Sequence, residues 1–284
     1  MRKLLLQLDT STHPSVFDRV VAYDGGADEV MSYGGVTPEA VRDLVHGAIF
    51  TRGPKDLKNT AVFIGGTDMA AGERLLKAVR KAFFGPFTVS VMLDSNGSNT
   101  TAVAAVTKLL QTAGPGGRAV VTAGTGPVGL RAAGLLAKAG VDVTFTSRRA
   151  VDPAIVEGLT QRFGGQIAHA VIADSGQAAS VLESATMLLN TGPAGVMLVP
   201  KAAWAGRSSL RAAADLNAVP PLGIEGIEVT DNAVARDGAT VFGALGVGGL
   251  KMKIHKACIA RLFERNDQVL DAETIAEVAG ELSK

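Results

Sequence analysis

The chain has 284 residues, of which 47% are hydrophobic and 19% charged, and its 28 basic and 27 acidic side chains leave a formal net charge of +1. This length suits two domains, and the apolar content can fill a core in each. The balanced charge is not typical of a nucleic-acid surface or a polybasic membrane face, and no apolar run is long enough to span a bilayer. The single cysteine excludes an intramolecular disulfide framework and fits a reducing compartment, so we expect a cytoplasmic protein.

The first 112 residues alternate predicted strands with predicted helices. Strands are expected at residues 3–8, 60–64 and 87–93, and a helix follows each of them, the last one ending near Thr112. Such alternation is typical of a parallel α/β layer. We therefore expect residues 1–112 to form an N-terminal α/β domain, joined by a C-terminal helix within residues 270–284.

Polar segments follow two of these strands. Asp9–Pro14 comes after the first strand, and Asp94–Thr101 comes after the third. Loops beyond the carboxyl ends of strands are where ligand contacts collect in α/β proteins. Eight consecutive polar or glycine residues at 94–101 exceed what a helix cap requires, which favours a ligand site. Capping of the next helix by Ser and Asn stays the alternative.

A strand–turn–helix–strand pattern begins the second half of the chain. Ala119–Ala123 is small and apolar, Gly124–Gly129 reads G-x-G-x-x-G, a helical run extends to Lys138, and Val141–Thr146 predicts a second strand. In this context the motif indicates a dinucleotide-binding turn, with the pyrophosphate at the helix start. A glycine-rich turn of an ordinary α/β protein is the alternative interpretation. The cofactor candidates here are Gly124, Thr125, Gly126, Pro127, Val128 and Gly129.

The second of these strands ends without an acidic residue. An NAD site usually carries Asp or Glu at this point, about 20 residues after the first glycine, to bind the ribose hydroxyls. Here Ser147, Arg148 and Arg149 follow instead. A hydroxyl and two guanidinium groups suit a 2′-phosphate, so NADP is the predicted cofactor and NAD should bind more weakly. The alternative is that both arginines lie in solvent at the end of the strand and bind no ligand.

The remaining pattern extends this Rossmann-type domain over residues 113–269. A helix is expected at 153–163 and strands at 166–172, 186–189 and 209–214. The strand at 186–189 leads into Asn190, Thr191 and Gly192, close to where nicotinamide lies in this fold, so these three are further cofactor candidates.

A second glycine-dense stretch occupies residues 242–251. It lacks a phosphate-loop pattern, so close backbone packing and ligand contact both stay open. A helix is expected at 252–265, and Cys258 fits a packed position in it. The four histidines are scattered without metal-ligand spacing, so no metal is expected.

Three long blocks of the sequence resemble one known family. They are DTSTHPSVFDRVVAYDGGAD at 9–28, GPFTVSVMLDSNGSNTTA at 85–102 and FGALGVGGLKMKIHKACIARLF at 242–263. Together with the AGTGPVG turn, they resemble the NAD(P)-dependent methylene-tetrahydromethanopterin dehydrogenases. This family is similar in architecture to the folate methylene dehydrogenase/cyclohydrolases. The resemblance implies an N-terminal pterin-binding α/β domain and a C-terminal Rossmann-type NADP-binding domain, with the pterin in the cleft between them.

The resemblance also implies an activity. A hydride would pass from methylene-tetrahydromethanopterin to NADP, giving methenyl-tetrahydromethanopterin, in one-carbon (formaldehyde oxidation) metabolism. Loss of hydride leaves a cation stabilised by two neighbouring nitrogens, so catalysis is mainly positioning. Two alternatives stay open: a methylene-tetrahydrofolate dehydrogenase of the same architecture, and a non-catalytic NADP-binding redox sensor. A homo-oligomer is expected.

Site residues follow from the matched blocks. Lys251 matches a family position that faces the cleft, and we expect it to hold the polar edge of the pterin rather than abstract a proton. Lys253 and Lys256 are alternatives. The substrate candidates are Asp9, Thr12, Ser15, Tyr23, Asp24, Asn96, Ser98 and Asn99.

Overall fold

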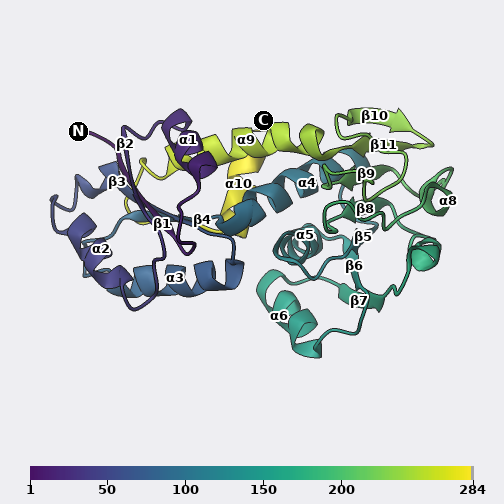
Figure 1. Ribbon diagram of the computed structural model, residues 1–284, viewed down its shortest axis with the longest axis horizontal. Coiled ribbons are helices and arrows are strands. Elements are labelled where there is room, and N and C mark those ends of the chain that lie inside the picture. Colours follow the sequence, from purple (N-terminus) through teal and green to yellow (C-terminus); the bar gives the residue numbers. More distant parts are fainter. Residues whose placement is uncertain (283–284) are drawn as a thin grey trace. The chain divides into compact units, whose positions relative to one another are not determined.

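Two separate sheets organise the computed structural model, which describes residues 1–282 (Figure 1). A five-stranded sheet belongs to a unit that comprises Met1–Thr100 and the described residues from Met252 on. A seven-stranded sheet belongs to a unit that comprises Thr101–Lys251. The predicted fold class, two α/β domains, is confirmed. We call these the first and the second unit.

The sheet of the first unit is parallel throughout, with the strand order β12-β4-β3-β1-β2. The three inner strands of this order are buried over most of their length, as is typical of a parallel sheet that is covered on both faces. β2 and β12 were not predicted from the sequence. The strands are β1 (Leu4–Asp9), β2 (Glu29–Tyr33), β3 (Thr60–Gly65), β4 (Ser90–Leu93) and β12 (Val269–Leu270).

Helices α1 (Val16–Asp24), α2 (Val41–Ile49), α3 (Met69–Ala82) and α10 (Ala272–Glu281) complete the first unit. One face of α2 and α3 packs on the sheet and forms an apolar core around Val45, Leu75 and Val79, all fully buried. α10 confirms the expected C-terminal helix over its described part, and residues 283 and 284 of that prediction lie outside the described residues.

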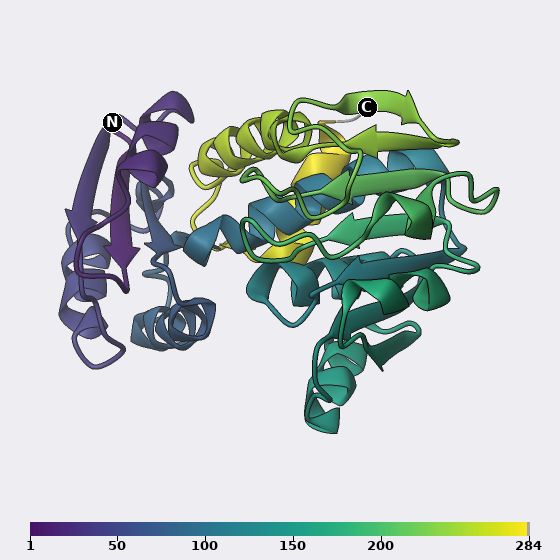
Figure 2. The ribbon, with the colours of Figure 1, turned by 45° about the vertical axis from the view of Figure 1, so that its right-hand side comes forward.

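The second unit contains a larger sheet with the order β10-β11-β9-β8-β5-β6-β7, parallel except for the β10–β11 pair (Figure 2). Its strands are β5 (Arg118–Thr122), β6 (Asp142–Ser147), β7 (Ile167–Val171), β8 (Met187–Asn190), β9 (Ala212–Asp215), β10 (Asn232–Arg236) and β11 (Ala239–Phe242). Its shorter helices are α5 (Pro127–Lys138), α6 (Pro153–Phe163), α7 (Ala178–Val181) and α8 (Lys201–Trp204).

Two long helices, α4 (Ser98–Ala113) and α9 (Ala244–Arg261), contain the boundaries between the units. The boundaries fall at Thr100–Thr101 and Lys251–Met252, whereas the sequence suggested 112–113 and 269–270. The difference arises because residues after Met252 pack on the first unit. A Cβ added at Gly25 would lie 2.6 Å from the Cβ of Ile259, so this part of α9 is in direct contact with the end of α1.

The prediction of a helix at 252–265 was wrong at both ends, since α9 begins at Ala244 and ends at Arg261. Its first two turns are rich in glycine, which disfavours a helix, so the sequence pattern did not indicate them. A Cβ at Gly243 would lie 2.0 Å from the carbonyl oxygen of Glu228, and one at Gly246 would lie 2.0 Å from that of Asp231. Close backbone packing therefore explains these two glycines.

Cys258 is fully buried in α9, and burial raises the pKa of its thiol well above the usual range. The expected packed position is confirmed. None of the helices within residues 1–282 combines the length and apolar character that crossing a bilayer requires.

Candidate functional site

The glycine turn between β5 and α5 has the geometry of a dinucleotide-binding turn. A Cβ at Gly124 would lie 2.7 Å from the Cβ of Phe145, and one at Gly129 would lie 2.5 Å from the Cα of Gly124. Both positions are therefore closed to larger residues. A Cβ at Gly126 would meet nothing within 4 Å. The middle glycine thus borders open space at the helix start, which Pro127 begins at its first position.

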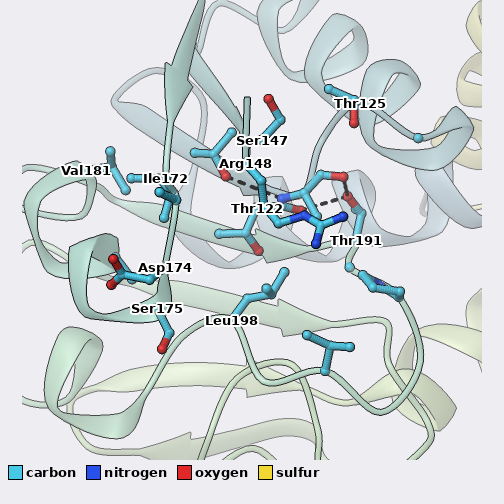
Figure 3. Close-up of a pocket in the computed structure, with 18 residues that line it drawn as sticks. Thr122, Thr125, Ser147, Arg148, Ile172, Asp174, Ser175, Val181, Thr191 and Leu198 are labelled. Atoms are coloured by element: carbon cyan, nitrogen blue, oxygen red, sulfur yellow. Dashed lines mark hydrogen bonds between the residues drawn. The ribbon is translucent and has the colours of Figure 1, made fainter. Parts of the chain in front are cut away.

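A cavity of about 490 Å³ lies at this turn, within the second unit (Figure 3). Thr125 and Thr191 lie on one side of it, and Ile172 and Val181 lie on the other. Its lining residues come from the carboxyl ends of neighbouring parallel strands, where ligands bind in this fold. They are Thr122, Ala123, Thr125, Gly126, Thr146, Ser147, Arg148, Ile172, Ala173, Asp174, Ser175, Ala178, Val181, Thr191, Gly192, Pro193, Val196 and Leu198.

The end of β6 presents a guanidinium group to this cavity. Arg148 is exposed and lines the cavity, while Arg149 is exposed and is not among its described lining residues. Three hydrogen bonds hold Ser147 in place. Its backbone carbonyl accepts from the N–H of Ile172 at 2.8 Å, and its Oγ lies 2.5 Å from the carbonyl oxygen of Arg149 and 2.7 Å from Nε2 of His169.

A buried polar network lies at the ends of β8 and β9. Asn190 accepts from the hydroxyl of Thr122 at 2.8 Å and donates to Oδ1 of Asp215 at 2.7 Å. Asp215 in turn accepts from the N–H groups of Asn217 and Ile224. Asn190 is fully buried, so its side chain supports the cavity wall, whereas the predicted neighbours Thr191 and Gly192 line the cavity.

These residues fit a dinucleotide. The helix start at Gly126 offers backbone N–H groups to a pyrophosphate, and Ile172, Ala178 and Val181 give an apolar wall suited to a flat base. Arg148 adds a positive charge at the strand end where the ribose binds in this fold. No carboxylate stands at positions 147–149 to oppose a 2′-phosphate.

In the first unit, Asp9 organises the loop after β1. Asp9 is 1% exposed, and its carboxylate accepts from the N–H groups of Ser11 at 2.7 Å and Ser15 at 3.1 Å. Ser15 caps α1 by accepting from the N–H of Asp18. Thr12, at the tip of this loop, is exposed. Asp9 and Ser15 therefore shape the loop, and Thr12 is accessible to a ligand.

The polar run after β4 caps α4 more extensively than the sequence suggested. Oδ1 of Asp94 accepts from the N–H groups of Asn99 and Thr100 at 2.9 and 3.0 Å, and Nδ2 of Asn99 donates to the carbonyl of Leu93 at 2.5 Å. Ser98 donates to the carbonyl of Ser95. Among residues 94–100, Asn96 is the exposed one, with a positive φ of 55°. Asp94 is thus the residue that caps α4, while the side chains of Ser98 and Asn99 tie the start of the helix to the carbonyls of the preceding segment.

The loops after β1, β3 and β4 are joined to one another. The N–H of Thr67 donates to Oγ of Ser11 at 3.1 Å, and the N–H of Asn96 donates to the carbonyl of Gly66 at 2.6 Å. The structure therefore brings Thr12 and Asn96 to one edge of the sheet. Ser11 lies in the polar loop 9–14 that the sequence indicated, whereas Gly66 and Thr67 were not among the candidates, although their position after β3 could have indicated them.

The remaining substrate candidates lie on α1 and α9. Tyr23 is exposed, with the guanidinium of Arg19 6.0 Å from its ring centre. Asp24 forms an ion pair with Lys256 at 2.7 Å, which gives Lys256 a structural contact. Lys251 is half-buried in α9 and Lys253 is exposed.

Part of the lining of the cavity at the glycine turn was not predicted from the sequence. These residues are Ile172–Ser175 after β7, Ala178 and Val181 of α7, and Leu198 after β8, and no motif marks them. His169 was noted only as one of four scattered histidines. Within residues 1–282, no group of three or more His, Cys, Asp or Glu side chains is placed to hold a metal ion.

A parallel sheet with a G-x-G-x-x-G turn at the mouth of a cavity defines the class of dinucleotide-binding α/β proteins. Residues 16–96 match the region described as "Methylene-tetrahydromethanopterin dehydrogenase, N-terminal". The chain belongs to the methylene-tetrahydromethanopterin dehydrogenase family, as its relatives in Methylorubrum extorquens show. "Bifunctional protein MdtA" is 50% identical over 287 residues, 99% of each chain. The "NAD(P)-dependent methylenetetrahydromethanopterin dehydrogenase" is 30% identical over 297 residues, 98% of this chain and 99% of its own.

Solved structures share the fold. Shikimate 5-dehydrogenase from Listeria monocytogenes, in complex with shikimate and NAD, gives a TM-score of 0.58 at 13% identity, over 98% of this chain and 96% of its own. The enzyme from Mycobacterium fortuitum gives a TM-score of 0.50 at 19% identity, over 98% of each chain. At these identities the likeness shows the fold alone.

Proposed function

We propose that this chain is an NADP-dependent dehydrogenase that transfers a hydride from methylene-tetrahydromethanopterin to NADP, giving methenyl-tetrahydromethanopterin. Its family membership supports the pterin substrate. The observation that carries the cofactor assignment is the cavity at the glycine turn, with the open space at Gly126 and Arg148 on its wall. The activity is expected in one-carbon metabolism.

Each part of the cavity has a task in this proposal. Bound NADP supplies an oxidised nicotinamide ring that accepts the hydride. The first turn of α5 would hold the pyrophosphate, Arg148 the 2′-phosphate, and Thr191 and Gly192 the nicotinamide side. With no acid–base step required of the protein, its contribution is to orient both reactants.

The substrate would contact the first unit. The exposed Thr12 and Asn96 at the joined loops are our strongest candidates for direct contact, with Tyr23 on α1 as a further one. Asp9, Ser15, Ser98 and Asn99 would act by shaping these loops, and Asp24 through its ion pair. Lys251 would hold the polar edge of the pterin.

A direct assay tests the proposal. Purified protein is mixed with NADP and either methylene-tetrahydromethanopterin or methylene-tetrahydrofolate, and NADPH formation is followed by absorbance. We expect reduction that requires both partners and is fastest with the methanopterin. Binding of NADP without reduction by either pterin would contradict the dehydrogenase assignment, and faster reduction with the folate would reverse the choice of substrate.

We further propose that the enzyme works in the cytoplasm as a homo-oligomer. A single, buried cysteine suits a reducing compartment. Light scattering on the purified protein measures the subunit number, and a monomeric mass at assay concentrations would contradict the oligomer.

A further inference from the structure

His169 lies outside the cavity wall but contacts its support. Its Nε2 is 2.7 Å from Oγ of Ser147, and its ring centre is 5.1 Å from that of Phe145, which is fully buried. Phe145 in turn lies against Gly124 of the glycine turn. His169 therefore connects the base of that turn to the end of β6, where Arg148 enters the cavity.

The direction of these hydrogen bonds follows from the atoms involved. The carbonyl oxygen of Arg149, 2.5 Å from Oγ of Ser147, can only accept. The hydroxyl of Ser147 must therefore donate its one hydrogen to that carbonyl, and it must accept from the Nε2–H of His169. Burial lowers the pKa of His169, which favours the neutral ring, with its hydrogen on Nε2 in this arrangement.

This arrangement changes the role expected of Ser147. A 2′-phosphate needs hydrogen-bond donors, and the hydroxyl has no second hydrogen to give. Its contact instead closes a turn from Ser147 to Arg149, and Arg148 is the residue in the middle of that turn. Arg148 is thus the group of this segment that lines the cavity and can donate to a phosphate.

We infer that His169 is a positioning residue for nucleotide selectivity: by donating to Ser147, it holds the 147–149 turn in the conformation that directs Arg148 to the 2′-phosphate. The inference rests on the proposed function, because it assumes that the cavity binds NADP. It adds a determinant on β7, two strands away from the glycine turn. We expect the affinity for a nucleotide without the 2′-phosphate to depend little on His169.

Equilibrium binding of two small nucleotides tests this role without turnover. Adenosine 2′,5′-bisphosphate and adenosine 5′-monophosphate differ only in the 2′-phosphate. Calorimetry on the full chain gives the ratio of the affinity for the bisphosphate to the affinity for the monophosphate. In His169→Leu we expect this ratio to fall about 2- to 10-fold, the factor that the loss of one neutral hydrogen bond gives. Binding of the monophosphate should change little.

Two further variants separate the hydrogen bond from the shape of the ring. His169→Gln can place an amide N–H near the position of Nε2, so we expect it to restore most of the ratio. The double variant His169→Leu/Ser147→Ala should lose no more than Ser147→Ala alone, because both substitutions break one connection. Ala168→Ser, at the exposed neighbouring position on β7, is the matched control and should behave as wild type.

The outcomes distinguish this inference from the proposed function. An unchanged ratio in His169→Leu would overturn the inference, and so would an equal loss in His169→Leu and His169→Gln. Equal affinity of the wild type for both nucleotides would overturn it together with the NADP assignment. A wild type that discriminates as expected but reduces no NADP with either pterin would contradict the dehydrogenase alone.

Discussion

At the scale of single residues, Gly126 and Gly129 of one turn have opposite surroundings. A Cβ at Gly129 would lie 2.5 Å from Gly124, and one at Gly126 would meet nothing within 4 Å. Gly129 serves the fold, since the helix and the turn touch there. We expect Gly126 to serve the ligand, since a pyrophosphate approaches the backbone at this position in a dinucleotide-binding turn.

We therefore expect the two alanine substitutions to separate stability from binding. Gly129→Ala should lower the free energy of unfolding by about 1–3 kcal/mol, as overpacking does. Gly126→Ala should leave the melting temperature of the protein without ligand nearly unchanged and weaken NADP binding. Thermal unfolding and calorimetry on both variants measure this. A loss of stability in Gly126→Ala equal to that in Gly129→Ala would contradict the assignment.

Arg148 should determine the preference for NADP over NAD. A hydrogen bond to a charged group contributes about 1.5–3 kcal/mol, which is a factor of roughly 10 to 150. Arg148→Ala should reduce the ratio of kcat/KM for the two cofactors by that factor. Arg149→Ala should reduce it less, because Arg149 is not among the described lining residues. A ratio near one in the wild type would show that these side chains do not select the phosphate.

Lys251 should affect turnover rather than cofactor binding. Lys251→Ala removes an ammonium group that we expect to orient the pterin, and misplacement of a reactant costs up to about 100-fold in rate. We expect kcat to fall strongly while the Kd for NADP stays nearly unchanged. Lys253→Ala, two residues along α9 and exposed, is the comparison. A larger loss in Lys253→Ala would move the role to that residue.

At the scale of elements, an ion pair spans β10, from Asp231 just before the strand to Arg236 at its end. Both carboxylate oxygens of Asp231 accept from Arg236 at 2.7 Å, and Oδ2 also accepts from the N–H of Glu228. Burial alone would raise the pKa of Asp231, but Arg236 and this N–H outweigh it and hold the pKa below its usual range. The pair therefore stabilises the fold fully above the usual carboxyl pKa and loses this effect as the pH falls through the lower, folded value.

Asp231→Asn should cost about 1–3 kcal/mol of unfolding free energy near pH 7. The difference from wild type should shrink as the pH falls below about 4, where the wild-type carboxylate also becomes protonated. Melting temperatures across this pH range measure it. Asp237→Asn is the control, because its ion pair with Lys201 is more exposed and Asn tolerates its positive φ of 47°. A constant difference at all pH values would contradict the assigned cause.

The pattern of apolar residues predicted well the helices and strands in which it is continuous or periodic, and it predicted the others poorly. The turn from β5 through α5 to β6 could be predicted, because its strands are continuously apolar and its glycines have fixed spacing. β2 and β10 could not, since neither is a continuous apolar run and most of their residues are exposed or half-buried. The start of α9 could not, because glycine is a poor helix former and Gly246 is required there by a backbone contact.

The candidate cofactor site was predictable only where a motif or a strand end marks it. Gly126 belongs to the glycine motif after β5, and Arg148 and Thr191 directly follow β6 and β8. The apolar wall around Val181 depends on where the segment after β7 places the short helix α7, which local sequence does not specify. At Asp94–Thr101 the sequence favoured a ligand site over a cap, and the structure shows that Asp94 caps α4 by accepting from the N–H groups of Asn99 and Thr100.

At the scale of the whole molecule, the first unit is discontinuous in sequence. β12 extends its sheet by pairing with β4, and Ser90 of β4 donates to the carbonyl of Arg265 at 2.9 Å. Leu270 and Ile275 of this C-terminal segment are fully buried. The N-terminal part of the unit therefore packs against a segment that follows the whole second unit in the sequence.

Leu270→Ala should therefore destabilise the first unit, by about 2–5 kcal/mol of unfolding free energy. Hydrogen exchange should show faster exchange in β4 and little change in β5 of the second unit. Val269→Ala, on the same strand but partly exposed, should have a smaller effect. Unchanged exchange in β4 would show that the pairing with β12 contributes little.

The buried Cys258 has a practical consequence for experiments. It is the one cysteine of the sequence, it is fully buried, and its thiol has a raised pKa. Because only the thiolate reacts with alkylating reagents, the folded chain should be almost inert towards them. A cysteine introduced on an exposed loop would then provide a unique reactive position. A fluorophore or spin label could be attached there without removing any native side chain.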